Sequence, residues 1–159
     1  MGVTVRPFRA EDGQAVADLF VATVRRVNAR DYDAAQVAAW SAAGADPARW
    51  VERLAGRAAF VAEIDGVVVG FADVTDTGYF DHLYVSPDHQ GRGAGTALAD
   101  AVEAAVGTGM LEAEVSLTAR PFFERCGYRL VRAQDKPAHG LTYRNFVMVK
   151  RLVPRDGLR

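Results

Sequence analysis

The chain has 159 residues, half of them hydrophobic and a quarter charged, and its formal net charge is −1. This length suits one domain with a sizeable core, and the composition excludes a disordered or fibrous protein. Near-neutral charge and scattered arginines argue against nucleic acid as the main partner. We find neither an apolar run of membrane-spanning length nor a signal-peptide pattern, and therefore expect a cytoplasmic protein without a membrane partner.

The first third of the chain predicts a strand followed by helices. Residues 4–8 suit a short strand, and apolar residues recur every three or four positions between residues 16 and 27, as on one face of a helix. A second helix is expected within residues 32–40. A third begins at Asp46-Pro47, because proline favours the first helical position.

The middle of the chain predicts an antiparallel meander. Residues 60–64 and 67–74 are rich in β-branched and aromatic side chains and meet at Asp65-Gly66. That pair favours the positive φ angles of a tight hairpin turn. Residues 79–85 suit the next strand, so three successive strands would run antiparallel.

Helices and strands alternate in the rest of the chain. The expected elements are, in order, an amphipathic helix that ends near 107–109, a strand at 111–117, a short helix from Ala119, and strands at 128–133 and 142–152. This order predicts an α/β (α+β) fold in which a mixed, mostly antiparallel sheet of about six to seven strands has helices on both faces. The domain would span residues 1–153, with a short mobile tail at 154–159.

Cys126 is the single cysteine, and the three histidines show no metal-ligand spacing. The sequence therefore predicts no intrachain disulfide and no metal cofactor. A role for Cys126 as a covalent nucleophile is one alternative. Its place on an apolar stripe with Phe122 favours simple packing.

A loop with glycines at three alternate positions, Gly91, Gly93 and Gly95, precedes the amphipathic helix. Such a loop lets backbone N–H groups and the positive end of the helix dipole meet a pyrophosphate. A tight strand-to-helix turn without a ligand is the alternative. A dinucleotide-binding fingerprint would need a small residue at Thr96 and a parallel βαβ unit, and a P-loop would need a Gly-Lys pair.

Two motifs resemble those of the GNAT superfamily of N-acetyltransferases. Gln90-x-x-Gly93-x-Gly95, after Leu83-Tyr84-Val85, resembles the acyl-CoA motif, and residues 119–128 resemble the C-terminal helix motif. Residues 28–50 resemble the corresponding region of a bacterial subgroup of acetyltransferases in this superfamily. The resemblance covers nearly the whole chain and implies transfer of an acetyl group from acetyl-CoA to a primary amine, by direct attack in a ternary complex.

The resemblance also implies which residues hold the cosubstrate. The strand before the loop would splay from its neighbour, and the N–H of Val85 would donate to the thioester carbonyl. The implied CoA-binding residues are Leu83, Tyr84, Val85, Gln90, Gly91, Arg92, Gly93, Ala94, Gly95, Thr96, Ser116, Phe122 and Phe123.

Asp81 and His82 are the candidates for the base that removes a proton from the amine. Strand alternation places Asp81 on the face with Leu83 and Val85 and places His82 on the other, with Phe80 and Tyr84. We therefore prefer Asp81 as the base, although His82 has the more suitable intrinsic pKa.

The family often has a tyrosine acid where this chain has Phe123, and an asparagine where it has Ser116. Tyr128 and Tyr143 are the alternative acids, and a thiolate also leaves with little assistance. A non-catalytic acyl-CoA-binding regulatory module therefore stays an alternative, and a nucleotide-binding protein is a weaker one. The expected partners are acetyl-CoA and an amine acceptor, and a homodimer is one option for the oligomeric state.

Overall fold

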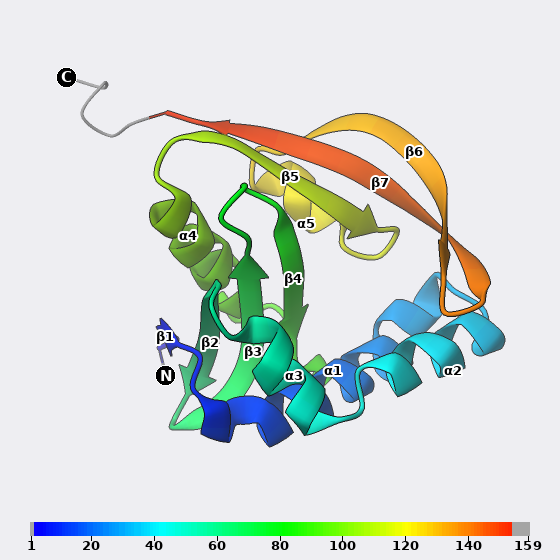
Figure 1. Ribbon diagram of the computed structural model, residues 1–159, viewed down its shortest axis with the longest axis horizontal. Coiled ribbons are helices and arrows are strands. Elements are labelled where there is room, and N and C mark those ends of the chain that lie inside the picture. The colour runs from blue at the N-terminus through cyan, green and yellow to red at the C-terminus, as the bar shows by residue number, and fades with distance from the viewer. Residues whose placement is uncertain (1, 154–159) are drawn as a thin grey trace.

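The computed structural model describes residues 2–153, and the first half of the chain forms a four-stranded antiparallel sheet in the order β1-β2-β3-β4 (Figure 1). Its strands are β1 (Thr4–Pro7), β2 (Ala58–Ile64), β3 (Val67–Val74) and β4 (Phe80–Val85). Asp65 and Gly66 have φ angles of 52° and 78° between β2 and β3. The predicted hairpin is thereby confirmed.

The second half forms a three-stranded antiparallel sheet in the order β5-β7-β6. Its strands are β5 (Gly109–Ser116), β6 (Arg129–Ala138) and β7 (Leu141–Leu152). One parallel bridge, between Tyr79 and Glu112, joins the two sheets. The predicted mostly antiparallel arrangement of about six to seven strands is confirmed with seven strands, and within residues 2–153 its mixed character is limited to that bridge.

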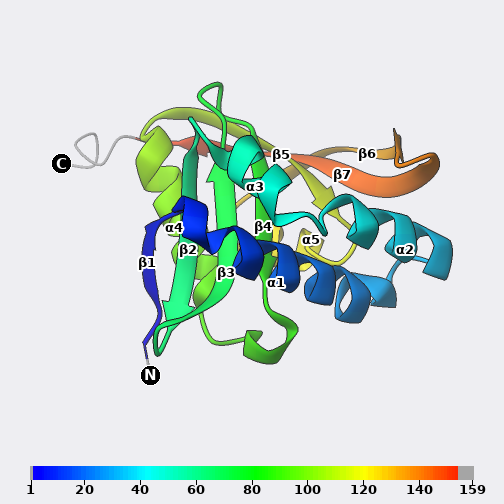
Figure 2. The same ribbon diagram turned by 60° about the horizontal axis from the view of Figure 1, so that its bottom comes forward.

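Helices cover both faces of the first sheet, as predicted. Figure 2 shows α1 (Gly13–Arg26) and α3 (Pro47–Leu54) in front of this sheet and α4 (Ala94–Val106) behind it. Two further helices, α2 (Ala34–Ala43) and α5 (Arg120–Arg125), lie toward the second sheet. No helix in the described part of the chain has both the length and the apolarity needed to cross a membrane.

Local sequence explains where the N-terminal helices begin. The carboxylate of Asp33 accepts a hydrogen bond from the Gln36 N–H at 2.8 Å, and the Gln36 side chain bonds back to the Asp33 N–H. Because this capping box ends the preceding loop, α2 starts at Ala34, two residues later than predicted. Asp46 caps α3, which begins with Pro47 as expected.

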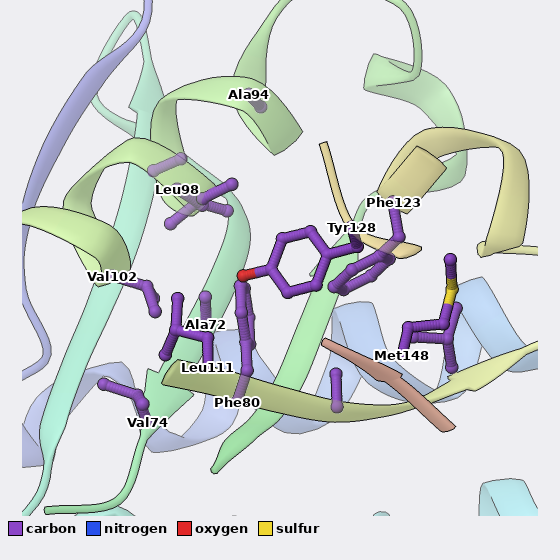
Figure 3. Packing of buried hydrophobic residues seen from close by; sticks show 14 of the residues in the cluster. Ala72, Val74, Phe80, Ala94, Leu98, Val102, Leu111, Phe123, Tyr128 and Met148 are labelled. Atoms are coloured by element: carbon purple, nitrogen blue, oxygen red, sulfur yellow. The ribbon is translucent and has the colours of Figure 1, made fainter. Parts of the chain in front are cut away.

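The main core lies between the first sheet, α4 and the second sheet. Figure 3 shows Phe80, Phe123 and Tyr128 packed together near Leu98 of α4. Phe80 therefore shares a core with Leu83 and Val85, whereas alternation placed it with His82 and Tyr84. That expectation was wrong for a local reason.

A β-bulge breaks the alternation in β4. Asp73 pairs with His82 and Val74 pairs with Phe80, which leaves Asp81 as an extra residue. A bulge re-aims the side chains around it. As a result, the side chains of Asp81 and His82 are neighbours, with Nε2 of His82 3.8 Å from Oδ1 of Asp81, and both residues line the cavity described below.

The last hairpin is longer than its sequence suggested. β6 runs to Ala138, past Pro137, and turns at His139 and Gly140, whose φ angles are 53° and 75°. Proline is tolerated because β6 is an edge strand that pairs only with β7 in the described part of the chain. The expected mobile tail, 154–159, lies outside the described residues.

Candidate active site

A cavity of about 810 Å³ opens between the two sheets, beside β4 and β5. Its walls come from the helices α1, α2, α3 and α5, the strands β4 and β5, the glycine-rich loop and the β6–β7 hairpin. Arg92 and Tyr128, both singled out in the sequence, are not lining residues. The other sequence-predicted residues line it: Asp81, His82, Leu83, Tyr84, Val85, Gln90, Gly91, Gly93, Ala94, Gly95, Thr96, Ser116, Phe122, Phe123 and Tyr143.

β4 and β5 are joined at one end and separate toward the other. The N–H of Glu112 donates to the Gly78 carbonyl at 3.0 Å, next to the Tyr79 bridge. Beyond that point β4 pairs with β3 and β5 pairs with β7, with no ladder between them in residues 2–153. The splayed strand that the family resemblance implied is therefore present.

The edge of β4 presents backbone groups to this gap. The N–H of Ser86 donates to the Val69 carbonyl at 2.7 Å, so the N–H of Ser86 points toward β3. Since donors alternate along an antiparallel pair, the N–H groups of Leu83 and Val85 point away from β3. They are placed to bond a ligand that lies along β4.

The carbonyl of Val85 is already bonded. It accepts from Nε2 of Gln90 at 2.7 Å and lies 3.0 Å from Oγ1 of Thr23 on α1. The Gln90 side chain therefore anchors the strand end, and the loop offers a phosphate its backbone N–H groups rather than this amide. Thr23 was not singled out from the sequence, because an isolated threonine on a helix carries no functional pattern.

The glycines of the loop meet specific steric needs. Gly91 and Gly93 have φ angles of 73° and 90°, and Gly93 is the N-cap residue of α4. A Cβ on Gly95 would lie 3.2 Å from the Phe122 ring. The first N–H groups of a helix have no intrahelical acceptor, so the start of α4 can receive an anion. Arg92 is exposed beside it.

Two of the predicted residues serve the local structure. The hydroxyl of Ser116 accepts from the Ala119 N–H at 3.0 Å and so supports the turn into α5. The Tyr128 side chain lies in the core, with its hydroxyl buried and without a hydrogen-bond partner among the described residues. Burial raises the pKa of Tyr128 far above its ordinary value. The structure does not bring this phenol to the cavity.

Tyr143 belongs to an aromatic group at the other end of the cavity. Its ring centroid lies 6.0 Å from that of Tyr32 and 5.8 Å from that of Trp40. Its hydroxyl donates to the Gln36 carbonyl at 2.8 Å, and burial raises its pKa. A phenol that keeps its proton and already donates it is a poorer acid than the sequence implied.

Asp81 lies in an ion-paired environment. Its carboxylate is 2.7 Å from Nη1 of Arg57 and 3.7 Å from Nη2 of Arg53. Burial acts to raise the pKa of Asp81, but His82 and the two guanidinium groups outweigh it and hold the pKa below the ordinary value. The carboxylate is therefore charged at neutral pH.

Behind Asp81 lies a residue that the sequence pattern did not single out. Asp73 is completely buried, and its carboxylate lies 2.7 Å from Nδ1 of His82 and 2.6 Å from Nη1 of Arg57. An aspartate inside the otherwise apolar strand 67–74 could have indicated this network, because a buried carboxylate requires a partner. The identity of that partner, Arg57, depends on the tertiary fold.

The same group of side chains could be considered as a metal site. Ligand atoms of Asp73, Asp81 and His82 lie within 4.8 Å of one another. Nη1 of Arg57 contacts both carboxylates, at 2.6 Å and 2.7 Å. A guanidinium already neutralises these charges, so the donor set fits an ion-pair network better than a cation site.

The family model of the acetyltransferase (GNAT) domain matches residues 28–150. The chain is 32% identical over 146 residues to the uncharacterized N-acetyltransferase YafP of Escherichia coli (strain K12), a match that covers 92% of this chain and 94% of YafP. It superposes with a TM-score of 0.91 and 35% identity on the crystal structure of the GCN5-related N-acetyltransferase "aminotransferase, class-II" from Rhodopseudomonas palustris, covering 96% of this chain and 97% of that one.

A more distant structure shares the fold. The PaiA N-acetyltransferase of Thermoplasma acidophilum, solved in complex with coenzyme A, has a TM-score of 0.74 and 16% identity, and the match covers 95% of this chain and 99% of that one. With the splayed strands and the glycine-rich loop, the matching domain model and the relatives above 30% identity show that this chain belongs to the GNAT family of acetyltransferases.

Proposed function

We propose that this protein transfers an acetyl group from acetyl-CoA to a primary amine by direct attack in a ternary complex. The observation that carries the proposal is the continuity of one cavity along three features: the free edge of β4, the start of α4 and the group around Asp81 and His82. The first two suit CoA and the third suits proton removal from an amine. We take residues 1–153 as one domain that acts in the cytoplasm.

The cosubstrate would lie along β4 and end on the loop. The N–H groups of Leu83 and Val85 suit the amides of a pantetheine arm, and the start of α4 suits the pyrophosphate. The coenzyme A complex of PaiA supports this use of the fold. The N–H of Val85 would stabilise the negative charge that grows on the thioester oxygen during attack.

Direct attack is supported by the position of the only thiol. Cys126 is absent from the lining of the main cavity, and burial raises its pKa. A thiol that resists ionisation is a poor nucleophile. An acyl-enzyme on Cys126 therefore has no geometric support, and the amine nitrogen itself would attack the thioester.

The amine would enter from the aromatic end of the cavity, bordered by Tyr32, Trp40 and Tyr143. The group that accepts its proton would be Asp81 or His82, which both line the cavity. The leaving thiolate would be protonated by water, since neither Phe123 nor the buried Tyr128 offers a proton in the cavity.

The test is thiol release from acetyl-CoA against a panel of primary amines, with CoA binding measured in parallel by calorimetry. Amine-dependent release that follows acetylation of the amine would support the proposal. CoA binding without release for any amine would favour a non-catalytic regulatory module, for which Phe123 is the sequence feature. Binding of ATP or NAD in competition with CoA would instead favour the nucleotide-binding alternative.

A further inference from the structure

The carboxylate of Asp73 fixes the tautomer of His82. Oδ1 of Asp73 lies 2.7 Å from Nδ1 of His82, and Oδ2 lies 2.6 Å from Nη1 of Arg57. An ionised carboxylate can only accept hydrogen bonds, so Nδ1 carries the proton and donates it. The lone pair of the neutral imidazole is then on Nε2.

The ring has little freedom to turn away from this position. The His82 side chain is 10% exposed and packs edge to face against Trp50, with centroids 5.0 Å apart. Nε2 lies 3.8 Å from Oδ1 of Asp81, beyond hydrogen-bond distance, and both residues line the cavity. Nε2 has no hydrogen-bond partner among residues 2–153 and is available to an amine or a water molecule in the cavity.

Asp81 is the weaker proton acceptor of the two. The side chain of Asp81 is 14% exposed. Its carboxylate lies 2.7 Å from Nη1 of Arg57 and 3.7 Å from Nη2 of Arg53. A general base works best when its pKa is close to the operating pH. The guanidinium groups of Arg57 and Arg53 instead lower the pKa of Asp81. Asp81 is instead placed to stabilise a positive charge on His82.

We propose that His82 is the general base of the acetyl transfer and that Asp73, itself held by Arg57, is its positioning residue. This inference rests on the proposed function. The amine nitrogen attacks the thioester carbonyl carbon, and Nε2 of His82 receives the proton that the nitrogen loses, directly or through one water. The C–S bond then breaks with its electron pair on sulfur. The imidazolium, flanked by Asp73 and Asp81, returns the proton to the CoA thiolate through solvent.

The proposal predicts a pH profile with one ascending limb. The charged groups around His82 are Asp73 from β3, Asp81 from β4, Arg53 from α3, and Arg57 just after α3. A general base acts only in its unprotonated form, so kcat at saturating amine should rise with pH along one limb and then level off.

The experiment compares the parent protein with His82→Gln, Asp73→Asn and Asp81→Asn, using an amine that the panel identifies. His82→Gln should lower kcat by about 10²–10⁴ and abolish the ascending limb, because a general base contributes about that much. Asp73→Asn should lower kcat by about tenfold or more while CoA binding stays within about twofold, because the base is retained but its tautomer is no longer fixed. Asp81→Asn should keep the ascending limb.

Asp12→Asn is the matched control for Asp73→Asn. Asp12 is also buried and bonded to an arginine, Arg6, at 2.8 Å, and it does not line the cavity. Its loss should lower stability but leave kcat and the pH profile unchanged. If Asp12→Asn lowers kcat as much as Asp73→Asn does, the effect of Asp73 is structural and the positioning role is overturned.

Nitrogen-15 NMR of the His82 ring provides a readout that needs no turnover. The parent should show the neutral tautomer with its proton on Nδ1, and Asp73→Asn should show a mixture of tautomers. The inference is overturned if the parent carries the ring proton on Nε2. It is also overturned if Asp81→Asn loses the ascending limb and His82→Gln keeps it. In either case, amine-dependent release by the parent still supports the transferase. Absence of release in the parent removes the proposed function and, with it, the inference.

Discussion

The rings of Phe123 and Tyr128 pack edge to face, with centroids 5.0 Å apart and planes at 77°. Both rings also pack against Phe80, at 5.5 Å and 6.4 Å. The aromatic cluster fills the space between β4 and α5, and it explains why a tyrosine near the C-terminal helix is not in the cavity. Tyr128 is a core residue that retains a hydroxyl.

Tyr128→Phe should therefore stabilise the protein. The Tyr128 hydroxyl is buried without a partner among the described residues, and removing such a group should raise the free energy of unfolding by about 1 kcal/mol. Denaturant titration of both proteins measures the change. The rate of acetyl transfer should be unaffected, and a tenfold lower kcat in the variant would instead identify this phenol as the acid.

Gly93→Glu should abolish CoA binding. A carboxylate at the start of α4 would repel the pyrophosphate, and the φ angle of 90° adds strain of about 1–2 kcal/mol for any residue with a Cβ. Calorimetry with CoA measures the loss. Gly107→Glu is the control, because Gly107 has a φ angle of 81° at the other end of the same helix. If both variants lose CoA equally, strain in α4 rather than charge is the cause.

Thr23→Val should loosen the end of β4. It removes the hydroxyl that lies 3.0 Å from the Val85 carbonyl and 2.6 Å from the Leu19 carbonyl. We expect a loss of about 1 kcal/mol in the free energy of unfolding, together with weaker CoA binding. Thr23→Ser keeps the hydroxyl and should behave as the parent in both measurements. Equal CoA affinity in all three proteins would show that Thr23 supports the fold alone.

Asp12→Asn should lower stability in a pH-dependent manner. The hydrogen bonds from Arg6 are the main reason that the pKa of Asp12 lies below its ordinary value of 3.8, and burial only partly opposes them. A carboxyl with a depressed folded-state pKa stabilises the protein above its unfolded pKa, and this contribution is lost as the pH falls through the folded value.

The difference in unfolding free energy between the parent and Asp12→Asn should therefore be about 2 kcal/mol at pH 7 and should shrink below about pH 4. Urea titrations at pH 7, 5 and 3 measure it. A difference that stays constant down to pH 3 would mean that Asp12 contributes through geometry and not through its charge.

Local patterns were sufficient for most of the fold. The Asp65-Gly66 turn, the proline at the start of α3 and the glycines before α4 each impose a backbone geometry that neighbouring residues alone determine. The glycine-rich loop and the edge of β4 could therefore be located from the sequence alone. The extension of β6 past Pro137 could not, because it depends on pairing with β7.

The surroundings of Asp81 and His82 could not be predicted from the sequence for a different reason. Alternation along β4 assumes an unbroken ladder, and the bulge at Asp81 breaks it. The partners of His82 and Asp81 come from β3 and from the residues just after α3, so only the folded chain brings Asp73 and Arg57 to them. Local sequence thus predicted the positions of the glycine-rich loop and the edge of β4 better than the contacts of Asp81 and His82.

Within residues 2–153, the bridge between Tyr79 and Glu112 is the one ladder contact between the two sheets, so the edges of β4 and β5 beyond it are unpaired with each other. Unpaired strand edges often pair with another chain, but this edge lines a cavity between the two sheets. A pantetheine arm bound there would serve as the missing strand. The cosubstrate would then be a structural part of the protein, and its binding should slow amide hydrogen exchange at Leu83 and Val85.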